Sequence, residues 1–167
     1  MTNNDILWRI CVALDLSDAD VAAAFAHVKQ TVTTTDVAAW QKREDDPNYV
    51  ACTNLQLGQF LDGFIIARRG EREGGPPPIS DKPIDYNTVL RKLRIALDLQ
   101  SAQMLGILAS VDVEVSKHEL SALFRKPGHK HFRECLEPFM HLFLQGLQLR
   151  YTPMDDADDE RRLDSAG

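Results

Sequence analysis

The feature that most constrains this chain is an internal repeat with a constant offset of 83 residues. The run Ala13-Leu14-Asp15-Leu16 recurs as Ala96-Leu97-Asp98-Leu99. Without a gap between residues 4 and 68, the offset gives 15 identities in 65 positions, about 23%, whereas chance pairing at ordinary composition gives roughly 6%. The identities fall mainly on apolar and small residues, as a shared core would require. The chain therefore has to fold as two similar units.

Two segments lie outside the repeat. The run Gly70–Pro78 contains three glycines and three consecutive prolines, which continue neither a helix nor a sheet, so it is a linker. The run Met154–Glu160 is acidic and lacks apolar anchors, which is typical of a solvated tail. We expect a first helical repeat at 3–69, a Gly/Pro linker at 70–84, a second repeat at 85–151 and an acidic disordered tail at 152–167.

Helical periodicity runs through both copies. In the second copy, Val89, Leu93 and Leu97 share one side of a helix, with basic residues opposite. Ser116 with Glu119 forms a capping box, and so does Ser17 with Asp20. Each copy contains about four such helices and no long alternating strand pattern. The sequence predicts an all-α fold of two tandem, similar four-helix modules packed with pseudo-two-fold symmetry.

Two further pairs of equivalent residues predict details of packing. Gly63 and Gly146 fall at the same place inside the fourth helix of each copy, which suggests a close helix crossing. Cys52 and Cys135 precede that helix and are best explained as small apolar core residues. Three cysteines in 167 residues make no disulfide framework, and this favours a reducing, cytoplasmic setting.

Composition excludes several function classes. The apolar share of 44% is enough for a core, yet no stretch reaches the roughly 18–20 apolar residues of a membrane span. The N-terminus lacks the basic and apolar regions of a secretory signal. A formal net charge of −6 argues against a nucleic-acid binder that uses its whole surface, but not against a local basic patch. We expect no membrane association.

The strongest local feature is a basic loop in the second repeat. It concentrates four fixed positive charges and two histidines in nine residues: Arg125, Lys126, His129, Lys130, His131 and Arg133. Cations and turn N–H groups both suit anions, so these six residues are the candidate site for an anion or a partner. The opposing interpretation is a solvated loop whose charges balance acidic residues elsewhere in the chain.

A second interpretation is a helix-turn-helix unit, in which residues 116–126 would be the recognition helix. That helix offers Lys117, His118, Arg125 and Lys126 to DNA or RNA. The connection at 111–115 is longer than the usual three- or four-residue turn of this motif. An ordinary helix pair in a bundle therefore stays the alternative.

The sequence lacks a complete set of residues for a metal site or for nucleophilic catalysis. His129, His131 and Cys135 could ligate zinc, but the first copy repeats only the cysteine, and no second pair completes a tetrahedral site. A Cys135–His nucleophile pair has the same weakness. No phosphate-binding loop or other cofactor motif is present. We expect no cofactor, no metal and no catalytic residues.

Several segments carry a family resemblance: ALDLSDAD, KREDDPNYVAC, LDGFIIARRG, LRKLRIALDL, VSKHELSALFRKPGHKHFREC and FLQGLQL. Together they resemble the YehS-like bacterial proteins, which carry a duplicated domain-of-unknown-function module (family 1456). The resemblance covers residues 3 to about 151, and it implies a bacterial protein of two copies with no catalytic residue to carry over. The first-copy segment VTTTDVAAWQKRE departs from the more charged start expected of its third helix, so the two copies need not share one role.

These observations favour a non-enzymatic cytosolic module that binds another macromolecule through the basic loop. Its partner would be a protein or a nucleic acid. The alternative function is DNA or RNA binding through the helix-turn-helix-like unit. The sequence does not indicate an oligomeric state.

Overall fold

The fold of the chain is all-helical, as the sequence predicts. The computed structural model describes residues 1–75 and 80–152, and within these ranges it contains eight helices and no strand. The first half holds α1 (Asn3–Leu14), α2 (Asp18–Ala26), α3 (Thr34–Trp40) and α4 (Asn54–Arg69). The second half holds α5 (Tyr86–Ala96), α6 (Ser101–Ala109), α7 (Lys117–Ala122) and α8 (Glu137–Tyr151). Residues 153–167, which include nearly all of the expected acidic tail, lie outside the described ranges.

Local signals set where the helices begin. The capping boxes expected at Ser17 with Asp20 and at Ser116 with Glu119 are both present, and Thr33 with Asp36 forms the aligned one. Each box satisfies backbone N–H groups that have no partner within the helix. At the start of α8 a proline takes the place of such a cap, because a first-turn residue needs no N–H donor.

The two halves fold in the same register. Left-handed backbone conformations occur at Asp15 and Asp98, and again at Lys29 and Asp112. Each of these pairs is separated by 83 residues, the offset of the repeat. Turns in equivalent places therefore connect equivalent helices, which is independent structural support for the duplication.

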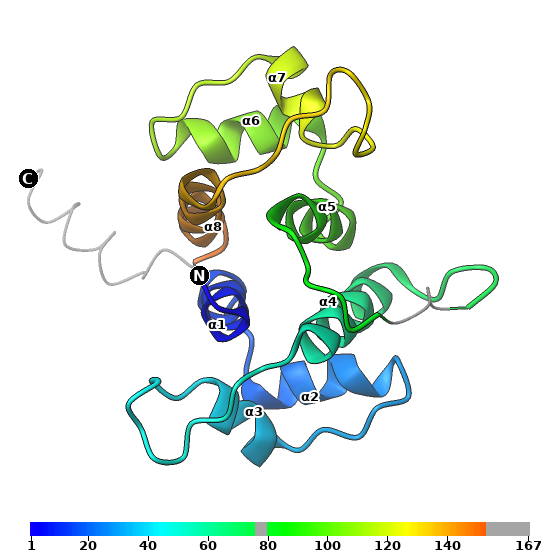
Figure 1. The fold of residues 1–167 in the computed structure, drawn as a ribbon, viewed down its shortest axis with the longest axis vertical. Helices are drawn as coiled ribbons and strands as arrows, with labels where there is room; N and C mark the ends of the chain where they lie inside the picture. The colour runs from blue at the N-terminus through cyan, green and yellow to red at the C-terminus, as the bar shows by residue number, and fades with distance from the viewer. Residues whose placement is uncertain (76–79, 153–167) are drawn as a thin grey trace, which may run out of the picture.

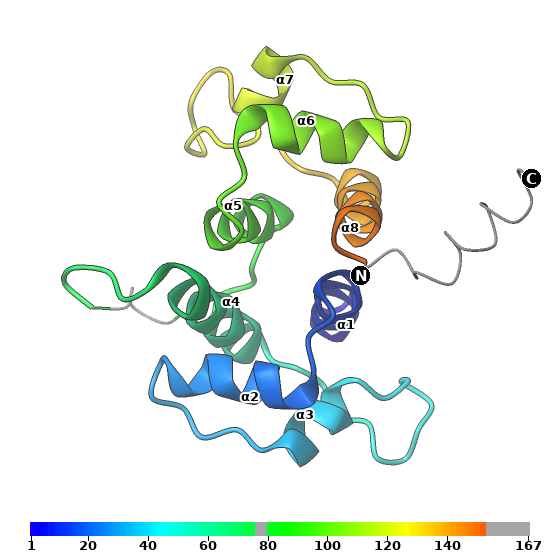
Figure 2. The same ribbon diagram turned by 180° about the vertical axis from the view of Figure 1, so that it is seen from behind.

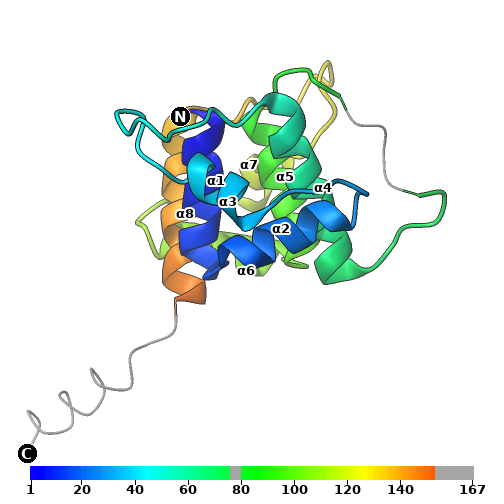
Figure 3. The ribbon, with the colours of Figure 1, turned by 90° about the horizontal axis from the view of Figure 1, so that it is seen from below.

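The halves pack through reciprocal helix pairs. Helix α1 packs against α8, and α5 packs against α4, while α2 and α6 cover α4 and α8 of their own halves. Figures 1 and 2 show α1, α8, α4 and α5 in the centre, with α2 and α3 at one end and α6 and α7 at the other. Figure 3 shows α1 and α8 side by side. Exchanging the halves converts one interface into the other, as an approximate two-fold axis would require; the axis itself stays a prediction.

One hydrophobic core runs through both halves. It contains Phe25 and Phe60 of the first half and Leu90 and Phe143 of the second, all less than 2% exposed. Since helices of opposite halves share this core, neither half is expected to be stable without the other. No helix in the described ranges is both long enough and apolar enough to span a bilayer.

The expected close crossings are present at both glycines. A Cβ atom on Gly63 would lie 1.9 Å from the carbonyl oxygen of Ala24, and one on Gly146 would lie 2.4 Å from that of Ile107. Only a glycine lets α2 approach α4, and α6 approach α8, this closely. The two carbonyls are again 83 residues apart.

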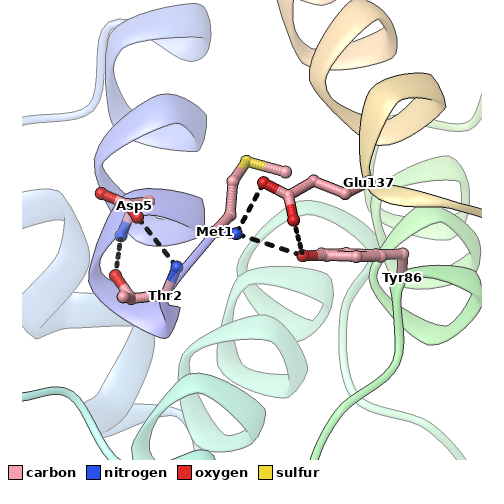
Figure 4. A network of polar contacts seen from close by, with 5 residues as sticks. All are labelled: Met1, Thr2, Asp5, Tyr86 and Glu137. Atoms are coloured by element: carbon pink, nitrogen blue, oxygen red, sulfur yellow. Dashed lines mark hydrogen bonds and ion pairs between the residues drawn. The ribbon is translucent and has the colours of Figure 1, made fainter.

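A polar contact joins the halves where α1 and α8 begin. The α-ammonium group of Met1 donates to Glu137 at 2.8 Å and lies 3.4 Å from the hydroxyl of Tyr86. Figure 4 shows these three residues beside the capping box of Thr2 and Asp5. The hydrogen bond and charge of the ammonium group lower the pKa of Glu137. The contact places the first turns of α1 and α8 next to each other, so the two helices run in parallel.

Candidate functional site

The basic loop is held at its base by one buried side chain, Asn87 in the first turn of α5. Its amide group donates to the carbonyl oxygens of Leu123 at 3.0 Å and Arg133 at 2.9 Å, and its Oδ1 accepts from the backbone N–H of Cys135 at 2.8 Å. Buried backbone groups outside regular structure need such partners. Asn87 thus holds the two ends of segment 124–134 together, and we call this segment clamped loop 2.

Backbone contacts make clamped loop 2 compact. The N–H of Arg133 donates to the carbonyl of Ala122, and that of Phe132 donates to His129. The N–H of His131 donates to Nδ1 of His129 at 3.0 Å. Because these bonds fix the backbone, little conformational entropy remains to be lost when a partner binds.

All six predicted site residues are exposed on clamped loop 2. Arg125, Lys126 and Lys130 make no ion pair with any residue in the described ranges. Arg133 contacts Glu119 at 3.5 Å, with both side chains about half exposed. An exposed ion pair of this kind contributes little to stability, so most of the positive charge of the loop is available to another molecule.

The structure also brings His118 of α7 to the loop. The ring of His131 lies 6.4 Å from that of His118 and 5.6 Å from that of His129. Sequence reasoning placed His118 only on the possible recognition helix and overlooked Asn87 as the residue that organises the loop. The available signal was an asparagine kept at equivalent positions, 4 and 87, among matches that are mainly apolar or small.

The first half contains the same clamp with different contents. Asn4 donates to the carbonyls of Trp40 and Val50 at 3.0 and 2.9 Å and accepts from Cys52 N–H at 2.9 Å. Residues 41–51, here called clamped loop 1, hold two basic and three acidic residues, a net charge of −1. Clamped loop 2 holds four basic residues and one acidic residue, a net charge of +3. Of the two clamped loops, only clamped loop 2 therefore carries a net positive charge.

Cys135 packs in the hydrophobic core. It is 3% exposed, and burial raises the pKa of its thiol to about 12. The equivalent Cys52 is 5% exposed, and burial raises the pKa of its thiol to about 12 as well. Since the thiolate is the reactive form, this site opposes a Cys–His mechanism. No group of three metal-ligating side chains is assembled in residues 1–75 and 80–152.

The predicted recognition helix at 116–126 is wrong in length. Helix α7 spans only Lys117–Ala122, and a turn follows at Leu123. Its six residues make less than two turns. Arg125 and Lys126, which were expected to contact bases from the recognition helix, consequently lie in clamped loop 2 and not on a helix.

Taken together, the geometry defines a class of protein: an all-helical tandem duplication whose two halves share a core and carry equivalent clamped loops. The chain belongs to the family described as "Protein of unknown function (DUF1456)", whose model matches it twice, at residues 3–70 and 86–152. The two matched segments are the two halves of the repeat, so the resemblance noted from the sequence is confirmed.

A relative supports the same assignment. The chain is 36% identical over 150 residues to the "Uncharacterized protein YehS" of Escherichia coli (strain K12), which covers 90% of this chain and 96% of the relative. No solved structure matches the chain.

Proposed function

We propose that this chain is a non-enzymatic, cytosolic binding module for a protein that presents a compact acidic surface, with clamped loop 2 as the contact. The observation that carries the proposal is the difference between the two clamped loops. Equivalent buried asparagines, Asn4 and Asn87, hold the two loops in the same way, yet only clamped loop 2 has a net charge of +3. The scaffold tolerates other charges, so it does not itself require the basic ones.

The arrangement of the charges supports a protein partner. Three cations, Arg125, Lys126 and Lys130, project from a short loop whose backbone is fixed, and none of them forms an ion pair within residues 1–75 and 80–152. Arginine donates to carboxylates in a bidentate manner. The rest of the chain is acidic, since the whole carries a net charge of −6. A long polyanion would meet that repulsion beyond the loop, whereas a short acidic segment would not.

Nucleic-acid binding is the second candidate function, and one observation favours it. Lys117 and His118 on α7 extend the basic surface beyond clamped loop 2, and His118 contacts the loop through His131. The contacts would be mainly with phosphates, because α7 is too short to read a groove.

The decisive experiment compares two matched double variants. The double variant Arg125→Glu/Lys126→Glu reverses the charge of two side chains in clamped loop 2. The double variant Lys42→Glu/Arg43→Glu reverses the charge at the equivalent positions of clamped loop 1. Binding of a short fluorescent hexaglutamate peptide and of a DNA duplex is titrated at several salt concentrations.

We expect the wild type to bind the peptide at low salt, with affinity that falls as salt rises. The clamped loop 2 variant should lose at least about tenfold in affinity, and the clamped loop 1 variant less than about twofold. Equal losses in both variants, or no binding at low salt, would refute the proposal. Preference for the duplex would establish the second candidate instead.

A further inference from the structure

A pocket lies between α4 and α5, away from both clamped loops. Its volume is about 280 Å³, close to the lower limit of small-molecule sites. Three isoleucines form its apolar wall: Ile65 and Ile66 of α4 and Ile95 of α5. Ile95 is 46% exposed although it is large and apolar. A pocket of this size and lining accepts a short aliphatic chain.

The rim of the pocket carries unpaired positive charge. Arg72 and Arg91 both line it, and neither makes an ion pair or a side-chain hydrogen bond within residues 1–75 and 80–152. Two arginines beside an apolar wall are suited to a ligand that is aliphatic at one end and anionic at the other.

The acidic residue in the pocket is already neutralised. Asp62 lines the pocket with a side chain that is 8% exposed, and Lys92 lies 2.5 Å from it with a side chain that is 19% exposed. This pair leaves the pocket with a net charge of +2 from the two arginines. An anionic head group is therefore attracted, and a cationic one is repelled.

The equivalent surface of the other interface lacks this chemistry. Between α1 and α8, Trp8 stands in place of Arg91, Val12 in place of Ile95 and Gln145 in place of Asp62. Trp8 and Val12 are 48% and 38% exposed, so the apolar character remains while the arginine is missing. The cationic rim is thus specific to the α4–α5 interface and is not a consequence of the duplication.

We propose that the pocket between α4 and α5 binds a small aliphatic carboxylate, with Arg72 and Arg91 holding the carboxylate group and the three isoleucines contacting the chain. The same chemistry occurs in a free medium-chain fatty acid and at the C-terminus of a protein that ends in an aliphatic residue. The site is separate from clamped loop 2, and its ligand is independent of the proposed function.

The test uses the full chain with isoleucine δ1-methyl groups labelled for NMR. The probes are octanoate, octylammonium and acetate, together with acetyl-alanyl-leucine as the free acid and as the amide. Octanoate should shift the methyl signals of Ile65, Ile66 and Ile95 but leave those of Ile6 and Ile10 in α1 unchanged. Octylammonium and acetate should shift none of them.

Paired variants separate a binding site from a general effect. Arg91→Gln should weaken octanoate binding about tenfold or more, the loss expected for a charge-assisted contact, and Ile95→Ser about threefold or more. The matched controls Arg9→Gln and Val12→Ser on α1 should change it less than about twofold. Thermal unfolding followed by circular dichroism checks that every variant is folded.

The outcomes are distinct. Binding of octanoate supports a free acid as the ligand, and binding of the peptide acid alone, without its amide, supports a protein C-terminus. Equal binding of octanoate and octylammonium, equal losses on α1 and α5, or no shifts with either octanoate or the peptide acid at millimolar concentration would overturn the proposal. The clamped loop 2 variant should still bind octanoate, so failure of one proposal does not affect the other.

Discussion

The two clamped loops have the same buried base and opposite exposed chemistry. Asn4 and Asn87 each make three hydrogen bonds to backbone groups at equivalent positions. Outside the clamps, clamped loop 1 has a net charge of −1 and clamped loop 2 a net charge of +3. Buried hydrogen bonds restrict substitution because unpaired groups are costly, whereas exposed charges can change freely. Differences between the halves on such a scaffold are therefore the places to look for function.

The largest effect should come from removing the clamps. Asn4→Ala and Asn87→Ala each delete two buried hydrogen bonds and one partly buried one, and leave two carbonyls and one N–H without the asparagine as partner. We expect each to lower the free energy of unfolding by about 4 kcal/mol, with similar losses at both sites, measured by urea denaturation. Asn48→Ala, on the exposed part of clamped loop 1, is the control and should cost less than about 0.5 kcal/mol. A loss at only one asparagine would contradict the equivalence of the clamps.

The sequence predicted the helices, the caps and the close crossings because these depend on local patterns and on the repeat. Gly63 and Gly146 could be assigned to a crossing since both copies keep them. The reciprocal interfaces were expected only in outline. Nothing in the periodicity states that α1 packs mainly against α8 of the other half, because the same apolar stripe could face either partner.

The site was predicted less completely than the fold. The six basic and histidine residues fall within nine consecutive positions, so their common location followed directly from the sequence. The role of Asn87 did not, since it depends on contacts with Leu123 and Arg133, 36 and 46 residues away. The end of α7 was also misjudged because residues 123–126 continue the helical composition while the backbone turns toward the clamp.

The helix crossings offer the next test of equivalence. Gly63→Ala and Gly146→Ala place a methyl group against a backbone carbonyl, and each should cost about 3 kcal/mol, with Gly63→Ala the larger because its approach is closer. Gly106→Ala is the matched control: this exposed position in α6 has no atom within 4 Å of an added Cβ. It should stabilise the protein by about 0.8 kcal/mol through helix propensity. Thermal or urea unfolding measures all three, and a neutral Gly63→Ala would rule out the close crossing.

The two interfaces should differ at their polar contacts. Lys92 and Asp62 form a largely buried pair between α5 and α4, while Arg9 and Gln145 occupy the equivalent positions and no hydrogen bond joins them within the described residues. Lys92→Met leaves the carboxylate of Asp62 unpaired and should cost about 2 kcal/mol. Arg9→Met should cost less than about 0.5 kcal/mol. Comparable urea midpoints for the two variants would show that the pair is not a structural difference between the interfaces.

The smallest difference is expected between Cys52 and Cys135. Burial raises the pKa of both thiols from 9.0 to about 12, so both should react slowly with a disulfide reagent at pH 8, with rates within about twofold of each other. Native thiols keep protons that the unfolded chain releases above pH 9, so stability should fall as pH rises from about 9 toward 12. Single-cysteine variants followed by mass spectrometry give the two rates, and unfolding midpoints at pH 8 and pH 10 give the slope. Much faster labelling of Cys135 in the folded protein would mean that His129 or His131 activates it, and the second half would then hold a nucleophile that its twin in the first half lacks.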